Sequence, residues 1–198
     1  MRIAILGSTN GSIVPKLAEG LKDLNLKSDI KFDISLIISN KEQAGILGKA
    51  KALDIKHKVC LSRGLEREVY DAKLTQILED NNIDLILLVG FMRILSADFC
   101  RRWHKKVLNI HPSLLPKYQG LMDLSVHQAV LDNNDTETGC SVHWVTEDVD
   151  CGPVLAQRKV PVLANDDANS LKARVQAEEV GCYSDALVII FEMNKATR

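Results

Sequence analysis

The segment LNIHPSLLP, residues 108–116, places an asparagine and a histidine two residues apart, a combination suited to acyl transfer. Residues 107–110, three of which are apolar, predict the end of a buried strand, and the prolines at 112 and 116 prevent further ladder hydrogen bonds. Side chains two apart in a strand share one face, so Asn109 and His111 should face one pocket. An amide there can hold a carbonyl oxygen and an imidazole can supply a proton, although a packed strand end is the alternative.

A histidine with this role needs a carboxylate to orient it or to raise its pKa. The segment TEDVDCGP, residues 146–153, offers Glu147, Asp148 and Asp150 in a predicted loop between two strands. Acidic loops are commonly solvated turns, and spacing alone does not choose among the three carboxylates.

The other four histidines fit less demanding roles. We expect His57, His104 and His127 at the surface, because their neighbours in the sequence are polar. His143 alternates within the segment CSVHWV and is expected in the core or beside the site.

A glycine-rich turn, GSTNGS at residues 7–12, follows a predicted strand and precedes a predicted helix. Such a turn aims backbone N–H groups and the positive helix end at a phosphate or carboxylate. Thr9 occupies the middle glycine of the dinucleotide fingerprint, and the G-K-[S/T] of a P-loop is absent, so nicotinamide and nucleoside triphosphate are disfavoured. A plain tight turn, with Ser12 capping the helix, is the alternative interpretation.

Short apolar runs alternate with amphipathic ones through the first half of the chain, which predicts a parallel sheet covered by helices on both faces. In the third helix Val69, Leu74, Ile77 and Leu78 should face inward, and Ser96 should start the fourth. Ligands bind beyond the carboxyl ends of such strands, where both suspected loops lie. The expected strands are 2–6, 32–39, 57–62, 84–90 and 106–110, and the expected helices 13–24, 41–53, 66–81 and 96–103.

The second half of the chain has a different pattern of apolar and polar residues. A short helix at 123–134 precedes two alternating segments, 138–146 and 153–162, that predict antiparallel strands, and a helix at 170–194 closes the chain. We therefore predict an α/β fold: one Rossmann-like doubly wound domain over 1–198, with a mostly parallel sheet, an antiparallel C-terminal part and a long closing helix. Residues 1–112 would form the phosphate-binding half and residues 113–198 the half with the catalytic loop.

Composition limits the partners. Of 198 residues 46% are hydrophobic, and 25 Lys plus Arg balance 26 Asp plus Glu, so no broad positive field attracts nucleic acid. No apolar run reaches the roughly 18 residues of a membrane span and no signal peptide is recognisable, so a cytoplasmic protein without membrane contact is expected. The five cysteines are scattered singly, which predicts neither a metal site nor a disulfide framework.

Four motifs together carry a resemblance: NIHPSLLPKYQG at 109–120, GFMRILS at 90–96, VTEDVDCGP at 145–153 and ARVQAEE at 173–179. In this order, and over essentially the whole chain, they resemble the phosphoribosylglycinamide formyltransferase family of purine biosynthesis. The resemblance implies transfer of a formyl group from 10-formyltetrahydrofolate to the amine of glycinamide ribonucleotide. It implies small-molecule substrates, no metal, and a monomer or homodimer.

The resemblance also assigns residues. It implies that Asn109, His111 and Asp150 are catalytic. The ribonucleotide-binding positions would be Asn10, Gly11, Ser12, Ile13, Gln176, Ala177, Glu178 and Glu179. The folate-binding positions would be Arg67, Met92, Arg93, Ile94, Leu95, Asn109, Thr146, Glu147, Asp148, Val149 and Asp150.

Departures from the family pattern leave alternatives. Thr9 and Ile13 stand where many members have glycine and asparagine, and the 120–130 stretch is a few residues longer than the short form. The same three catalytic residues serve formyltetrahydrofolate hydrolases and transferases that act on other amines. A phosphate-binding turn favours a phosphorylated small amine, with a hydrolase or a non-catalytic folate-binding protein as alternatives.

Overall fold

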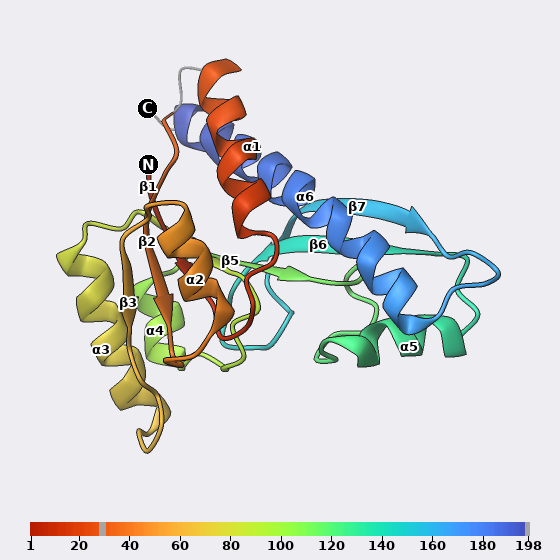
Figure 1. The fold of residues 1–198 in the computed structure, drawn as a ribbon, viewed down its shortest axis with the longest axis horizontal. Coiled ribbons are helices and arrows are strands. Elements are labelled where there is room, and N and C mark those ends of the chain that lie inside the picture. The colour runs from red at the N-terminus through yellow and green to blue at the C-terminus, as the bar shows by residue number, and fades with distance from the viewer. Residues whose placement is uncertain (28–30, 197–198) are drawn as a thin grey trace. The chain divides into compact units, whose positions relative to one another are not determined.

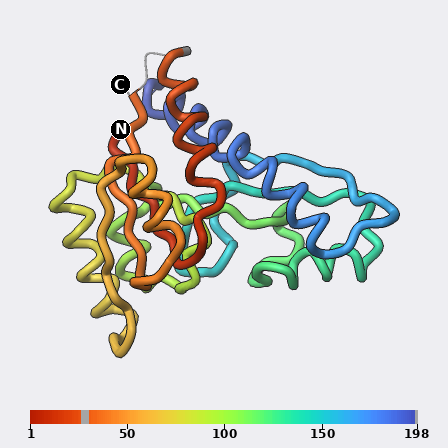
Figure 2. Tube along the Cα trace, in the orientation of Figure 1, coloured from red at the N-terminus to blue at the C-terminus, as the bar shows by residue number. Residues whose placement is uncertain are grey.

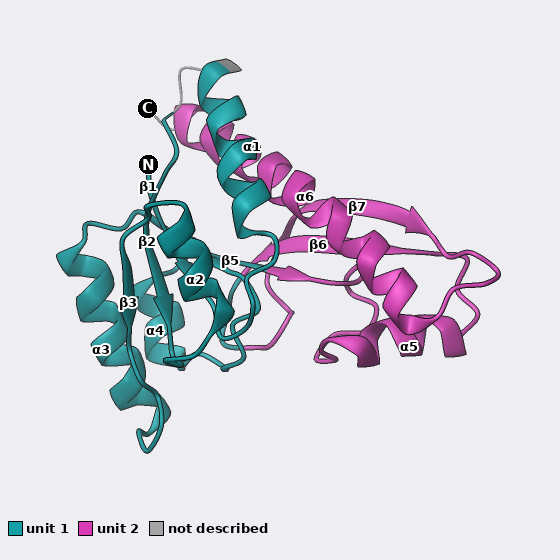
Figure 3. Ribbon diagram, in the orientation of Figure 1, with its two compact units in different colours: residues 1–109, 145–147 teal, residues 110–144, 148–198 magenta. Residues whose placement is uncertain are grey.

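The computed structural model describes residues 1–27 and 31–196. The chain divides into two compact units, described separately below (Figure 3). Unit 1 comprises residues 1–109 and 145–147, and unit 2 comprises residues 110–144 and 148–198. The strand order is β3-β2-β1-β4-β5-β6-β7, so the predicted α/β fold with a mostly parallel sheet is confirmed.

Unit 1 alternates strands and helices along the chain (Figure 1). Its parallel neighbours are β1 with β2, β1 with β4, β2 with β3, and β4 with β5. The last two residues of β5 fall in unit 2. The strands are β1 (Arg2–Leu6), β2 (Asp33–Ser39), β3 (His57–Val59), β4 (Leu85–Leu88) and β5 (Val107–His111), and the helices are α1 (Val14–Lys27), α2 (Gly45–Ala52), α3 (Arg67–Asp80) and α4 (Ala97–Arg102).

Alternation of side chains along the central strands builds the two sides of this sheet. Ala4 and Leu6 of β1 pack into a core with α3 and α4, where Tyr70, Leu74 and Phe99 are fully buried or nearly so. The intervening residues Ile3 and Ile5 are also completely buried. Helices α1 and α2 lie on that other face (Figure 1). Burial on both faces explains why these strands read as continuous apolar runs.

Unit 2 contains a hairpin and two helices. Strands β6 (Glu137–Trp144) and β7 (Val154–Pro161) pair antiparallel, with a register irregularity between Val142 and His143. The long α6 (Ala168–Ala196) packs on this hairpin, and α5 (Leu124–Asp132) packs on α6. The same path can be followed in the Cα trace of Figure 2. No helix within residues 1–27 and 31–196 has the length and apolarity to cross a membrane.

Two predictions within the helices were wrong in detail. Val69 is 48% exposed, and Tyr70 takes the buried position instead, because the helix begins only at Arg67 and its inward face is set by Tyr70, Leu74 and Leu78. Helix α2 begins at Gly45 rather than at 41, since residues 41–44 form a turn.

Two boundaries carry a physical explanation. β4 ends at Leu88, and Gly90 then adopts a φ of +60°, so the chain leaves the sheet. The predicted start of α4 is confirmed, because the Ser96 hydroxyl accepts a hydrogen bond from Phe99 N.

Candidate active site

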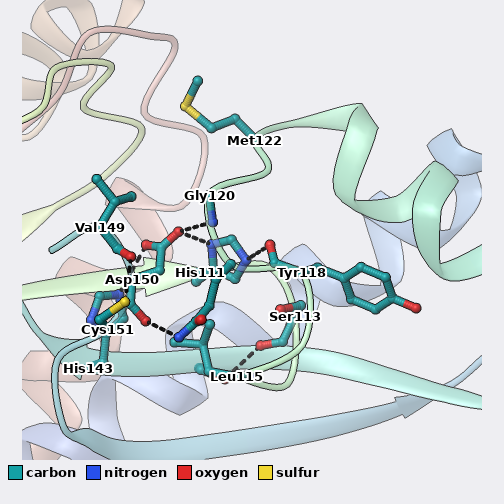
Figure 4. A network of polar contacts seen from close by, with 12 residues as sticks. His111, Ser113, Leu115, Tyr118, Gly120, Met122, His143, Val149, Asp150 and Cys151 are labelled. Carbon is teal, nitrogen blue, oxygen red and sulfur yellow. Dashed lines mark hydrogen bonds and ion pairs between the residues drawn. The ribbon is translucent and has the colours of Figure 1, made fainter.

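His111 is the last residue of β5 and its side chain is held at both ring nitrogens (Figure 4). Nδ1 lies 3.2 Å from Asp150 Oδ2, and Nε2 lies 3.0 Å from the carbonyl oxygen of Tyr118. The residue is 3% exposed. A neutral imidazole has only one N–H to donate, whereas both neighbours here are acceptors. The geometry therefore favours the doubly protonated imidazolium.

Asp150 is the carboxylate that the structure selects from the acidic loop. Its Oδ2 also accepts a hydrogen bond from Gly120 N at 3.0 Å, and its Oδ1 lies 3.5 Å from His143 Nε2. Burial by itself raises the pKa of the Asp150 carboxyl, but hydrogen bonds from His111 and His143 outweigh it and hold the pKa well below its usual range. The group is therefore a stable anion facing two imidazoles.

The loop after β5 is fixed by two residues of the hairpin, the buried Ser141 and the exposed Gln157. Ser141 on β6 donates its hydroxyl to Ser113 O at 2.6 Å and accepts from Leu115 N at 3.0 Å. Gln157 on β7 donates to Leu115 O at 3.0 Å and to the Ser141 hydroxyl at 2.8 Å. These bonds replace the ladder that Pro112 and Pro116 cannot continue.

Tyr118 was not predicted as a site residue, yet its backbone carbonyl accepts from His111. It has a φ of +62°, and its hydroxyl donates to Asp135 Oδ2 at 2.9 Å. Gln119 and Gly120 follow, and both donate to Asp150. The one sequence signal for this turn was the glycine of KYQG, since Gly120 has a φ of +75°.

Asn109 lies on β5 two residues before His111, as predicted, and is half-buried opposite Leu88 of β4 in the register. The strand geometry thus places the amide and the imidazole on the same side of the chain.

The predicted phosphate loop joins β1 to α1. Gly11 has a φ of +61°, and a Cβ there would lie 2.5 Å from a side-chain carbon of Ile46, so only glycine fits. Asn10 and Ser12 are exposed, whereas Ile13 turns its side chain into the core. Because α1 begins at Val14, residue 13 occupies the N-cap position that the alternative interpretation gave to Ser12.

The predicted ribonucleotide segment on α6 divides into two faces. Glu178 pairs with Arg158 of β7 at 3.2 Å. Burial raises the pKa of Glu179 to about 7, although the charge of Lys172 lowers it. Gln176 is partly buried and Ala177 is exposed. Because its pKa is about 7, Glu179 is the residue of this segment whose carboxyl gains or loses its proton near neutral pH.

The predicted folate residues of unit 1 include an exposed apolar pair. Met92 and Ile94 are 45% and 53% exposed, while Leu95 between Ile94 and Ser96 is buried. The Arg93 guanidinium stacks 4.6 Å above the ring of Tyr70. Large apolar side chains in a loop at the carboxyl edge of a sheet suit a flat aromatic ligand.

The other predicted folate residues lie in loops and at a helix start. Arg67 is the exposed first residue of α3. Thr146 accepts a hydrogen bond at its carbonyl from the Cys100 thiol at 3.3 Å, and Glu147 lies 3.9 Å from Arg101. Asp148 and Val149 are exposed.

His127 was predicted at the surface, and this was wrong. It is 1% exposed, because Val126, His127 and Val130 form one inward face of α5. Burial and the nearby Lys172 lower the pKa of His127 to about 4. Its polar neighbour Gln128 points the other way, which misled the sequence interpretation.

The predicted site residues are distributed over both units. Unit 2 brings His111 and Asp150 together and also contains Asp148, Val149 and 176–179. Unit 1 contains Asn109, Arg67, 10–13, 92–95 and 146–147. Two hollows in unit 2, of about 430 and 360 Å³, are lined by other residues. The described part of the chain contains no cluster of three His, Cys, Asp or Glu side chains that could hold a metal ion.

Comparisons with known proteins agree with the motifs. Residues 1–187 match the family model described as formyl transferase. Phosphoribosylglycinamide formyltransferase of Escherichia coli is 40% identical over 92% of this chain and 84% of its own. The solved phosphoribosylglycinamide formyltransferase of Brucella melitensis superposes with a TM-score of 0.83 at 38% identity, over 94% of this chain and 93% of that one.

A longer relative matches over part of its length. The trifunctional purine biosynthetic protein adenosine-3 of Drosophila melanogaster is 42% identical over 96% of this chain, which spans 14% of that protein. The resemblance predicted from the four motifs is thus confirmed. A match over most of the sequence, relatives above 30% identity and the shared fold together establish that this chain belongs to the formyl transferase family.

Proposed function

We propose that this chain transfers the formyl group of 10-formyltetrahydrofolate to the amine of glycinamide ribonucleotide, a step of purine biosynthesis. The observation that carries the proposal is the His111–Asp150 pair at 3.2 Å, with Asn109 two residues earlier on the same strand. We further propose that the chain works as one catalytic domain, in the cytoplasm, on small-molecule substrates.

The reaction requires stabilisation of negative charge on oxygen. The lone pair of the amine attacks the formyl carbon, a carbon–nitrogen bond forms, and the carbonyl electrons move to the oxygen. The Asn109 amide donates to that oxyanion, and the Nε2–H of His111 donates to it after exchanging its present partner, the Tyr118 carbonyl oxygen, for the oxyanion. When the intermediate collapses, the bond to the folate nitrogen breaks and that nitrogen takes up a proton. No covalent enzyme intermediate is needed.

Asp150 has a distinct part in this mechanism. A carboxyl whose pKa lies well below its usual range is a weak base, so it is poorly suited to take the amine proton itself. Its negative charge instead keeps His111 in the cationic form and fixes the ring. The amine proton would then leave through water. Positioning of two substrates would supply much of the remaining rate.

The binding roles follow from the same elements. The 10–13 turn, with its left-handed glycine and the start of α1, offers backbone N–H groups to the phosphate. Glu179 suits the ribose hydroxyls or the amine. The apolar side chains of the loop after β4 would cover the pterin, and Arg67 and residues 146–150 complete the folate side.

The direct test mixes the protein with formyl-folate, with and without glycinamide ribonucleotide, and follows folate absorbance. Formyl loss that depends on the ribonucleotide supports the transferase. Loss without the ribonucleotide would mean a hydrolase, and no loss would mean a binding protein; either result overturns the proposal. His111→Ala should lower kcat about 10²- to 10³-fold, the usual cost of removing an oxyanion donor. His104→Ala, at an exposed histidine, is the matched control.

A further inference from the structure

The loop that carries the proposed folate residues, 91–96, is held at several points. At its beginning Met92 N donates to the buried Ser8 hydroxyl at 2.9 Å, and Ser8 N donates to Gly90 O at 2.9 Å. These bonds tie the start of the 91–96 loop to the turn after β1. Its far end has a different anchor.

That anchor is Asp71, a carboxylate of α3 that is only 2% exposed. Its Oδ2 accepts a hydrogen bond from Ser96 N at 2.6 Å. Ser96 in turn caps α4 through its hydroxyl, which accepts from Phe99 N at 3.2 Å. One buried carboxylate therefore connects α3, the end of the 91–96 loop and the start of α4.

The surroundings of Asp71 show that this placement has a cost. Asp71 Oδ1 and Arg93 Nε are buried and have no hydrogen-bond partner within the described residues. Burying a carboxylate with one oxygen unpaired is unfavourable, and burial raises the pKa of Asp71. An apolar residue would pack in the same core with less penalty. A costly group that contacts the end of a ligand loop suggests a functional reason for keeping it.

The neighbouring residue supports the same loop. Tyr70 is completely buried, and Arg93 lies over its ring at 4.6 Å. Consecutive residues of α3 thus contact the middle and the end of the 91–96 loop. Between these two contacts stand Ile94, which is exposed, and Leu95, which is buried.

We propose that Asp71 is a positioning residue for folate binding: by holding Ser96 N–H it fixes the 91–96 loop in the conformation that presents Met92, Arg93 and Ile94 to the pterin co-substrate. This inference rests on the proposed function for the identity of the ligand. The inference leaves out the turn at 10–13. Ser8, which precedes that turn, bonds to Gly90 and Met92 at the start of the loop, whereas Asp71 bonds to Ser96 at its end.

The test replaces Asp71 with alanine and measures both substrates separately. Loss of the acceptor leaves a buried N–H unpaired, which should raise the KM for 10-formyltetrahydrofolate about tenfold. We expect kcat to stay within about threefold and the KM for the ribonucleotide within about twofold of the native values. Asp80→Ala is the matched control, since Asp80 is an exposed carboxylate of the same helix whose bond is to Gln76.

Hydrogen exchange at the Ser96 amide gives a readout that does not depend on activity. Asp71→Ala should accelerate that exchange at least about tenfold, and Asp80→Ala should leave it unchanged. Should the native protein show no formyl transfer, the proposed function fails while this measurement still reports on the anchor. An unchanged Ser96 exchange rate would overturn the anchor itself.

Two further results would reject the inference. One is a folded Asp71→Ala protein with a native KM for the folate. The other is a fall in kcat together with a similar rise in the KM of both substrates, which indicates general damage. If the alanine variant does not fold, Asp71→Asn takes its place. Its neutral oxygen accepts more weakly than a carboxylate, so the folate KM should rise about threefold, and a native value would overturn the proposal.

Discussion

Replacement of Asp150 by asparagine tests the central electrostatic argument with little change in shape. Asp150 has a φ of +55°, a left-handed conformation that asparagine tolerates well. The amide oxygen of the introduced asparagine can still accept from Gly120 N, which in the native protein lies 3.0 Å from the carboxylate. The substitution therefore removes the charge beside His111 and keeps the turn.

The expected magnitude follows from the distance. Charges 3.2 Å apart attract by about 5 kcal/mol at an effective dielectric constant of about 20. The asparagine dipole recovers part of this, and the carboxylate no longer has to be desolvated, so we expect a net loss of about 3–4 kcal/mol. If that energy stabilises the imidazolium in the transition state, kcat falls about 10²- to 10³-fold.

The assay is steady-state formyl transfer with both substrates varied, alongside a thermal unfolding curve. We expect the ribonucleotide KM to remain within about threefold, because Asp150 contacts His111, His143 and Gly120, so its effect reaches the reaction through His111. Asp132→Asn, at an exposed acid that ends α5 in the same unit, should retain native kcat. A folded Asp150→Asn enzyme with more than about a third of native kcat would refute the electrostatic role.

The remaining predictions concern stability and its dependence on pH. Burial raises the pKa of Glu179 to about 7 from an unfolded value near 4.5, so the folded state holds the extra proton and stability falls as pH rises between these values. Glu179→Gln should therefore be more stable than the native protein by about 1–3 kcal/mol at pH 8, with the gain lost near pH 4, as measured by denaturant unfolding at both pH values. Gly90→Ala should cost about 1–3 kcal/mol, since a Cβ there would lie 2.3 Å from a hydroxyl oxygen at a φ of +60°, whereas Gly48→Ala, with nothing within 4 Å, should be neutral or stabilising in the same melts. Ser141→Ala should lower the free energy of unfolding by about 2–3 kcal/mol, because buried groups of the loop after β5 lose both a donor and an acceptor; a change below about 0.5 kcal/mol would contradict this.

Much of the fold could be predicted because the signals are local. The alternation of short apolar runs with amphipathic segments predicts the parallel part of the sheet, because strands buried on both faces contain few polar residues. The start of α4 at Ser96 could be predicted from a cap that needs only the next three residues. Errors arose where helix faces are decided by packing: Val69 is 48% exposed and His127 is 1% exposed.

In the candidate site, too, local features could be predicted from the sequence and features set by packing could not. Asn109 and His111 belong to one strand, so their common face follows from a repeat of two residues. The choice of Asp150 over Glu147 and Asp148 does not follow from spacing, because all three share one loop. It depends on the turn at 118–120, whose backbone groups reach both Asp150 and His111.

The sequence by itself determined the order of the elements, the left-handed glycine of the turn at 10–13 and the pairing of an amide with an imidazole. Each of these is set by the conformational preferences of a few adjacent residues. Only the tertiary structure decided three contacts: the carboxylate of Asp150 pairs with His111, the Tyr118 carbonyl oxygen bonds to the second ring nitrogen of His111, and Asp71 anchors the 91–96 loop. Those contacts join segments distant in the chain, and their partners are fixed by how buried surfaces pack rather than by local preference.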